Sequence, residues 1–249
     1  MGELISHKFA TTTKRNKFMK KVQHPESKRY KEAKALVDAK KTYSIEEAME
    51  LVKKTSALKF DASVEVHAKL GVNPKKSDQL VRSSVPLPNG TGKTIIIAVV
   101  ATTPDAQKAA KTAGAEIVGD QELVNDIKAG KVTFDVLVAT PDSMKLLAPI
   151  AKVLGPKGLM PNPKDGTVTA NVADAVANLK KGKVNYKNDD SGNLHVMIGK
   201  SSFETAKLIE NYKALIDSIV KAKPQAMKGT YIKSITIAST MGPGVKVAL

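Results

Sequence analysis

Residues 87–94, LPNGTGKT, contain the residue types of a phosphate-binding loop, in which glycine N–H groups close on phosphates and a lysine neutralises them. The spacing is wrong, because Leu87 stands where that loop needs its first glycine, five positions before Gly92. A phosphate loop also opens a helix, whereas the following TIIIAVV is β-branched and predicts a buried strand. The dinucleotide fingerprint fails as well, since Ile95 replaces its third Gly or Ala. We therefore interpret this segment as a turn or hinge.

The sequence contains no other convincing catalytic or metal-binding pattern. It has no cysteine, and its histidines lack metal-ligand spacing, lying at His7, His24, His67 and His195. There is no Gly-x-Ser-x-Gly elbow. The NDDSGN segment lacks the pattern of a calcium loop, which favours turn roles for Asp189 and Asp190. We expect no enzyme, cofactor or metal site.

The charge of the chain is strongly positive, with 40 Lys and Arg against 24 Asp and Glu, a net +16. Such a balance favours polyanionic partners. Residues 92–181 hold 11 Lys and no Arg against 9 Asp and Glu, a net +2 that leaves +14 for the rest of the chain. Residues 1–25 hold six basic residues and predict either a flexible basic arm or a solvated tail. The charge that binds a partner therefore lies outside the middle of the chain.

The distribution of apolar residues along the chain predicts a protein without a membrane-spanning segment. No apolar run approaches the roughly 18 residues of a membrane-spanning helix. The first residues, MGELISHKFATTT, lack the apolar core of a secretory signal. We expect a cytoplasmic location.

The elements needed to position a partner-binding surface follow from periodicity. Ser44 and Glu47 form a capping box that starts a helix. Residues 60–72 then alternate apolar and polar in strict period two, which predicts a strand with one buried face, and a second strand follows at about 81–87. From residue 94 continuous apolar strands alternate with helices, expected at 105–113, 121–129 and 141–154, which is typical of a parallel sheet covered on both faces.

After residue 181 the two-faced pattern returns, with a hairpin expected from KVNYK and LHVMIGK, an amphipathic helix over 208–220 and a last strand at 231–240. These patterns predict an α+β and α/β fold. Residues 26–91 and 182–249 would form a two-layer α+β sandwich from both chain ends. Residues 92–181 would form an inserted three-layer, Rossmann-like α/β domain. Two Pro- and Gly-rich segments, 87–93 and 161–167, would be the paired strands of a hinge, with hinge residues Pro88, Gly90, Gly92, Pro163 and Gly166.

The outward face of the two-faced strands is the candidate site. It would carry hydroxyl and charged groups at Ser63, Glu65, His67, Lys69, Lys187, His195, Ser234, Thr236 and Thr240. The simpler interpretation is a solvated sheet face. However, three strands of the same chemistry in a chain of +16 favour structured RNA, which is read through 2′-hydroxyls and phosphates. Phe60, at the edge of its strand, has either a stacking role or ordinary core packing.

Three blocks of sequence, residues 59–93, 137–168 and 239–247, carry a family resemblance. They begin KFDASVEVHAKLGV, LVATPDSMKLLAPI and STMGPGVKV. The chain resembles the bacterial-type ribosomal protein L-one family of the mobile stalk of the large ribosomal subunit, from about Lys28 to Val247. The resemblance implies that the domain built from both chain ends binds large-subunit rRNA, beside other ribosomal components. It also implies a role in releasing deacylated tRNA from the exit site, and repression of its own operon mRNA.

The resemblance further implies a set of rRNA-contacting residues at matching positions: Lys59, Phe60, Ser63, Glu65, Lys187, Asp189, His195, Ser234, Thr240, Met241 and Gly242. Most of them fall on the outward face derived above. Three positions depart from the family pattern. Ser63 replaces a usual Thr and keeps the hydroxyl, whereas Lys187 replaces a common Arg and loses a planar, bidentate donor. Asp190 stands where a basic residue is frequent, which puts a phosphate contact of that turn in doubt.

Two alternative functions belong to other classes. A nucleotide-dependent activity of the α/β unit would require binding of ATP, GTP or NAD. A single-strand reader would stack bases on exposed aromatic rings, for which five Tyr and five Phe are a poor supply.

Overall fold

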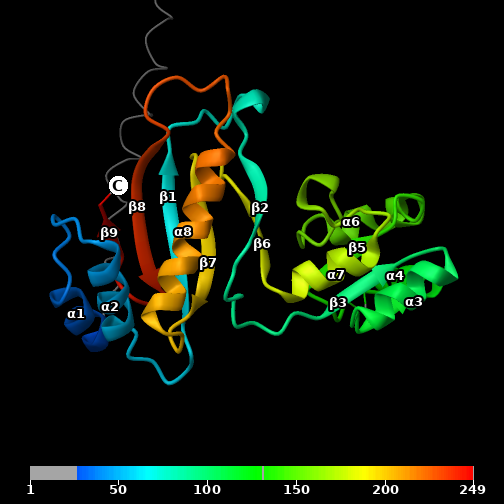
Figure 1. Ribbon diagram of the computed structural model, residues 1–249, viewed down its shortest axis with the longest axis horizontal. Helices are drawn as coiled ribbons and strands as arrows, with labels where there is room; N and C mark the ends of the chain where they lie inside the picture. Colours follow the sequence, from blue (N-terminus) through cyan, green and yellow to red (C-terminus); the bar gives the residue numbers. More distant parts are fainter. Residues whose placement is uncertain (1–26, 131, 249) are drawn as a thin grey trace, which may run out of the picture.

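A four-stranded antiparallel sheet takes its strands from both ends of the chain (Figure 1). The computed structural model describes residues 27–130 and 132–248. The strand order is β7-β1-β8-β9, formed by β1 (Ser63–Leu70), β7 (Asn193–Lys200), β8 (Ile232–Ser239) and β9 (Val245–Val247). Central β1 comes from the first third of the chain and pairs with β7 and β8 from the last.

The buried face of this sheet packs against two helices, α2 (Ile45–Thr55) and α8 (Thr205–Lys221). The inward side chains of β1 are almost completely buried, at Val64, Val66, Ala68 and Leu70, while the residues between them are partly exposed. The predicted period-two strand is therefore confirmed. The amphipathic helix is confirmed too, except that Val220 at its end is 53% exposed.

Capping determines where α2 begins. The Ser44 hydroxyl accepts the Glu47 N–H at 3.3 Å, and the Ser44 N–H donates to the Glu47 carboxylate at 3.3 Å, as the capping box predicts. Helix α1 (Lys28–Ala35) and strand β9 were not predicted. Helix α1 buries only Ala33 and so has no apolar stripe, and β9 is too short to show alternation. The basic arm at 1–25 lies outside the described residues.

The predicted hairpin after residue 181 does not form. Strand β6 (Lys183–Lys187) pairs instead with β2 (Arg82–Pro86) in a separate two-stranded sheet. Buried Asn188 explains the difference: its backbone N–H donates to the Val81 carbonyl at 3.0 Å, and its side-chain oxygen accepts the Val81 N–H at 2.8 Å. These bonds hold the end of β6 beside β2, so Lys187 does not lie on the four-stranded sheet.

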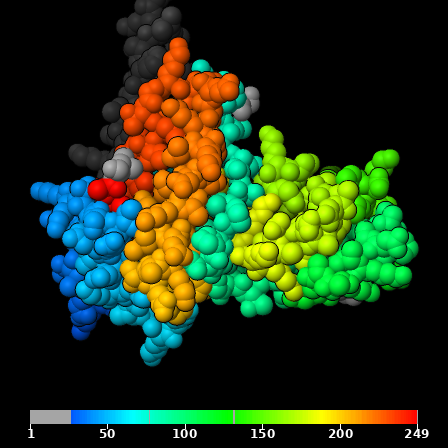
Figure 2. All heavy atoms as spheres, viewed as in Figure 1, coloured from blue at the N-terminus to red at the C-terminus, as the bar shows by residue number. Residues whose placement is uncertain are grey.

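The inserted unit has a parallel sheet of order β4-β3-β5, formed by β3 (Ile97–Val100), β4 (Ile117–Gly119) and β5 (Val136–Ala139). Ile97 and Val99 pack with α3 (Pro104–Thr112) and α7 (Val172–Lys180) on one face. Ala98 and Val100 pack with α4 (Gln121–Lys128) on the other. Figures 1 and 2 show this unit projecting to one side of the part built from the chain ends. The predicted fold class is confirmed.

The prediction of one continuous helix at residues 141–154 of the inserted unit is wrong. Residues 141–154 form α5 (Met144–Leu147), a 3-10 turn at Ala148–Ile150 and α6 (Ala151–Leu154). Pro149 lies in the middle of this segment, where it lacks the N–H of a helix ladder and its ring clashes with the preceding turn.

The chain crosses between the two parts at residues 87–96 and again at 181–182. The two crossings touch, because the Leu87 N–H donates to the Gly182 carbonyl at 3.3 Å. The predicted second hinge segment, with Pro163 and Gly166, lies elsewhere. It precedes α7, a helix that the sequence analysis missed, and forms the 3-10 helix η4 (Pro163–Asp165) within the inserted unit.

The crossing at residues 87–96 is held in place at both of its ends. Buried Asn211 of α8 donates from its amide nitrogen to the Gly90 carbonyl at 3.0 Å and accepts the Asn89 N–H at 3.1 Å. On the far side, Lys93 Nζ lies 2.7 Å from the Asp135 carboxylate of the inserted unit. Gly92, between these anchors, has φ +71°, which favours glycine.

The close approach of Gly182 to Gly90 yields a stability prediction. A Cβ on Gly182 (φ +93°) would lie 2.5 Å from the Gly90 Cα, a backbone atom that cannot rotate away. Gly229 has a similar φ of +87° with open space around it, so Gly229→Ala is the matched control. We expect Gly182→Ala to lower the free energy of unfolding by about 1–3 kcal/mol more than Gly229→Ala does. Urea denaturation followed by circular dichroism measures both, and equal losses would contradict the close packing of the crossings.

Candidate nucleic-acid interface

The face of the four-stranded sheet that no described helix covers holds most of the sequence-predicted site. Strand register aligns its outward side chains in rows across the strands, two of which are His195–His67–Thr236–Lys246 and Asn193–Lys69–Ser234. All of these residues are partly or fully exposed. Neighbouring strands lie about 4.8 Å apart, so each row presents closely spaced donors. The face offers hydroxyl, imidazole, amide and ammonium groups, which suit phosphates and sugar hydroxyls. Lys246, on the unpredicted β9, was missed by the sequence analysis.

Two histidines on the neighbouring strands β1 and β7 contact each other on this face. The Nδ1 atoms of His67 and His195 are 2.8 Å apart. Each outer nitrogen faces a carboxylate, with His67 Nε2 at 4.0 Å from Glu65 and His195 Nε2 at 3.7 Å from Asp189. Burial and the neighbouring His195 lower the pKa of His67, while Glu65 opposes that shift.

Asp189 organises the turn that leads into β7. One carboxylate oxygen accepts the N–H groups of Ser191 at 2.8 Å and Asn193 at 2.6 Å, and the other accepts the Asn193 amide at 2.9 Å. These bonds to Asn193, with further help from Ser191 and His195, lower the pKa of Asp189 to about 2. Both oxygens are engaged within the turn, in agreement with the turn role expected for this residue.

A hydroxyl joins β1 to the turn after β8 at one corner of the face. The Thr240 N–H donates to the Ser63 carbonyl at 2.9 Å. The Thr240 hydroxyl accepts the Ser63 N–H at 3.1 Å and contacts the Ser63 carbonyl at 3.3 Å. Lys200 Nζ donates to the Ser63 hydroxyl at 3.1 Å. Thr240 thus continues the strand ladder and fixes the turn that follows.

That turn presents a strained and exposed methionine. Met241 has φ +63°, the one positive value at a non-glycine residue in the part of the chain that the structure describes, and it is 68% exposed. Gly242 permits the turn, since a Cβ there would lie 2.3 Å from the Ser239 hydroxyl. Arg29 donates to the Met241 carbonyl at 3.2 Å. Left-handed backbone at a non-glycine residue is unfavourable and clusters at functional sites, so this outlier points to a role for the exposed side chain.

Phe60 lies at the same end of β1, three residues before Ser63. The residue is 54% exposed, so ordinary core packing, one of the two roles considered for it, is wrong. Neighbouring Asp61 accepts hydrogen bonds from the hydroxyls of Ser201 at 2.9 Å and Ser202 at 2.8 Å, which fix the chain just after the ring. Lys59, the preceding residue, is exposed as well.

Lys187 is separated from these residues, because it pairs with Arg82 on the β2–β6 ribbon. Both line a hollow of about 430 Å³ against the inserted unit. Across it, the Arg82 guanidinium binds the nearly buried Asp165 carboxylate, with Nε 2.9 Å from Oδ1, and the bidentate bond raises the pKa of Arg82. An ion pair thus joins the ribbon to the inserted unit.

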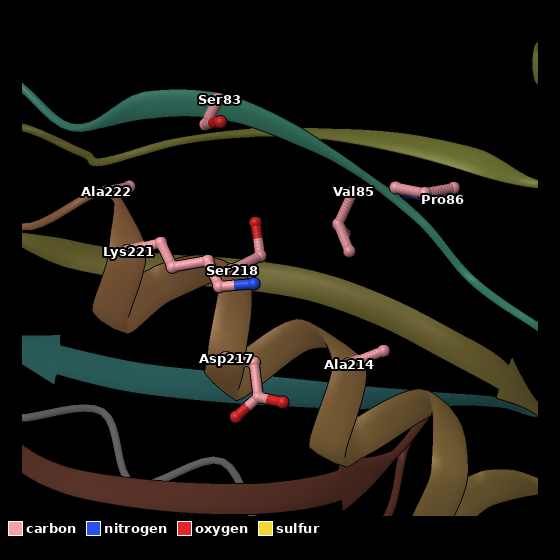
Figure 3. Close-up of a pocket in the computed structure, with 8 residues that line it drawn as sticks. All are labelled: Ser83, Val85, Pro86, Ala214, Asp217, Ser218, Lys221 and Ala222. Carbon is pink, nitrogen blue, oxygen red and sulfur yellow. The ribbon is translucent and has the colours of Figure 1, made fainter.

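Nucleotide chemistry receives no support from the remaining geometry. Strand β3, not a helix, follows residues 87–94, and Lys93 is paired with Asp135. In a hollow of about 510 Å³ between β2 and α8, Ser218 already shares a hydrogen bond with Tyr186, and Asp217 points away from β2 (Figure 3). Among the described residues, no group of three or more His, Asp or Glu side chains could hold a metal ion. In the same ranges, no helix combines the length and apolarity needed to cross a bilayer.

Comparison with known proteins identifies the family. The sequence profile of the Ribosomal protein L1p/L10e family matches residues 52–243. This chain belongs to that family. The large ribosomal subunit protein uL1 of Chromobacterium violaceum is 52% identical to it over 221 residues, covering 89% of this chain and 95% of the relative. The protein of the same name from Neisseria meningitidis serogroup C is 53% identical over 221 residues, with the same coverage.

Family membership confirms the resemblance and agrees with the expectation of a ribosomal protein rather than an enzyme. The matched segment includes the strands β1, β7 and β8 and the Met241 turn, whereas Lys246 lies beyond its end.

The carboxylate of Asp189 yields a pH prediction. Its folded pKa of about 2 lies below the ordinary value of 3.8, so its stabilisation of the turn is complete above pH 4 and is lost as the pH falls through about 2. We expect the amide NMR signals of Ser191 and Asn193 to shift together with a midpoint near 2. In Asp189→Asn this transition should be absent. A midpoint near 4 in the wild-type protein would contradict the bonding described here.

The backbone of Met241 yields a second stability prediction. Met241→Ala keeps the unfavourable φ, whereas Met241→Gly relieves it, and the exposed side chain is absent from both variants. We expect the glycine variant to be more stable than the alanine variant by about 1 kcal/mol in thermal or urea unfolding. An alanine variant that is equally stable would show that the turn carries no strain.

Proposed function

We propose that this protein is a structural constituent of the large ribosomal subunit in the cytoplasm and that it binds the rRNA of the mobile stalk. The observation that carries the proposal is the corner of the sheet where strained, exposed Met241 lies next to the Ser63–Thr240 pair. The uL1 relatives carry the name of the large subunit. The net +14 outside residues 92–181 supports a polyanionic partner of the part built from the chain ends.

The binding surface is proposed to combine two kinds of contact. Hydroxyls, imidazole and backbone groups meet phosphates and 2′-hydroxyls, while the exposed Phe60 and Met241 side chains pack on bases or sugars at the corner. The proposed contact residues are Lys59, Phe60, Ser63, Glu65, His195, Ser234, Thr240, Met241 and Gly242. Lys187 would contact RNA from the β2–β6 ribbon, and Asp189 would act by holding its turn.

The inserted unit is proposed to move relative to the RNA-bound part. We assign residues 26–91 and 182–249 to the rRNA-binding domain and 92–181 to the inserted domain. Pro88, Gly90 and Gly92 would form one strand of the hinge, and Gly182 replaces Pro163 and Gly166 in the other. A swing at these residues would let the unit assist release of deacylated tRNA from the exit site. Repression of its own operon mRNA would use the same surface on a similar RNA fold.

Binding to a folded stalk rRNA fragment tests the proposal. We expect Phe60→Ala and Met241→Ala each to weaken binding by roughly 10- to 100-fold, as loss of a base-packing contact does. Val220→Ala is the matched control, because Val220 is similarly exposed, at 53%, but lies at the end of α8. Filter binding or calorimetry at fixed salt measures all three.

Each outcome of this experiment is informative. Equal affinities of the three variants would overturn the placement of the site at the corner. Tighter binding of an unstructured single strand than of the folded fragment would favour the aromatic-stacking class instead. Binding of ATP, GTP or NAD by the wild-type protein would revive the nucleotide hypothesis.

A further inference from the structure

The two histidines on β1 and β7 form a pair whose charge state is constrained by their contact. A hydrogen bond between the Nδ1 atoms of His67 and His195, 2.8 Å apart, requires one ring to donate and the other to accept. The pair can take up one proton without losing this bond, at the outer nitrogen of the donating ring. Either outer nitrogen would then face a carboxylate, Glu65 at 4.0 Å or Asp189 at 3.7 Å. A second proton would break the bond and place two cations in contact.

Groups of both signs surround the pair in the free protein. Glu65 on β1 and Asp189 in the turn before β7 favour the proton. Partial burial of His67 and the neighbouring His195 oppose it. Two lysines lie on the same face, Lys69 on β1 and Lys246 on β9. Lys69 is partly engaged, since its Nζ donates to the Ser191 carbonyl at 2.6 Å. Strand β8 adds only hydroxyls at this place, Ser234 and Thr236. An anion that approaches the face would favour protonation of the pair.

We infer that the His67–His195 pair is a proton-linked phosphate contact, which takes up one proton when an RNA phosphate docks on the row His195–His67–Thr236–Lys246. The inference rests on the proposed rRNA binding. The row suits an anion because strand register places the imidazole pair, the Thr236 hydroxyl and the Lys246 ammonium side by side across four strands. In the pH interval between the pKa values of the free and the bound pair, protonation supplies a positive charge only when the phosphate is present.

The sign of the linkage follows from this exchange. A bound phosphate raises the pKa of the pair above its value in the free protein, where burial lowers the pKa of His67 from 6.5. Binding therefore takes up a proton in the interval between the two pKa values. Affinity increases as the pH falls through that interval and becomes constant below it.

The test is the pH dependence of binding to a folded stalk rRNA fragment, from about pH 8 to 5 at constant ionic strength. We expect the wild-type affinity to rise about tenfold over this range, which corresponds to a pKa shift of about one unit. In the double variant His67→Gln, His195→Gln, affinity is lower at every pH and no longer depends on pH. The matched control is His7→Gln, His24→Gln, which removes two histidines outside the described residues and keeps the wild-type dependence.

Calorimetry in buffers of different ionisation enthalpy gives a second readout, proton uptake near pH 7. We expect uptake of a fraction of one proton by the wild-type protein and none by the double variant, with both showing the same circular dichroism spectrum. Equal pH dependence in the two proteins would overturn the inference while leaving rRNA binding intact. A dependence that a chelator abolishes would also overturn it, by showing a bound metal ion in place of the proton. Absence of wild-type binding at every pH would remove the proposed function itself, and the inference with it.

Discussion

The pairing of β1 with strands from the opposite end of the chain is the interaction on which the rest of the molecule depends. Because β1 lies between β7 and β8, the sheet forms only when residues more than 120 positions apart come together. Its period-two pattern then sends Val64, Val66, Ala68 and Leu70 into the core and leaves the alternate side chains on the face that no described helix covers. Closing this sheet also requires that the inserted segment leave and return at one place. Contact between Gly90 and Gly182 meets that requirement.

The same pairing explains why the corner of the face can hold an unfavourable backbone. The Thr240 hydroxyl and N–H continue the β1–β8 ladder beyond its last strand residue, and Gly242 lets the chain turn back over Ser239. The residues on both sides of Met241 then fix its backbone conformation, so the left-handed φ persists. A preorganised apolar side chain loses little conformational freedom on meeting a partner. This is a physical reason for a site to be built at a strained turn.

Local signals in the sequence were sufficient for the elements whose own residues decide their form. The capping box at Ser44 and Glu47 gave the start of α2, and strict alternation gave β1. Elements without such signals were missed. Helix α1 buries one alanine, β9 spans three residues, and α7 follows a Pro- and Gly-rich stretch that was interpreted as a hinge. Pro149 interrupts the segment 141–154. The break was missed because the apolar residues on both sides of it pack into the same core, as those of one continuous helix would.

By itself, the sequence determined the fold class, the family, the separation of charge between the two parts and most of the outward residues. The family follows from the three blocks of similar sequence. The other three follow from composition and from periodicities that each strand or helix carries alone. Tertiary structure alone decided which strands are neighbours. Asn188 bonds to Val81 and so moves Lys187 onto a separate ribbon, while register brings His67 against His195 and adds Lys246 to their row. Such contacts join residues far apart in the chain, and the spacing of residues along one strand contains no information about the strand beside it.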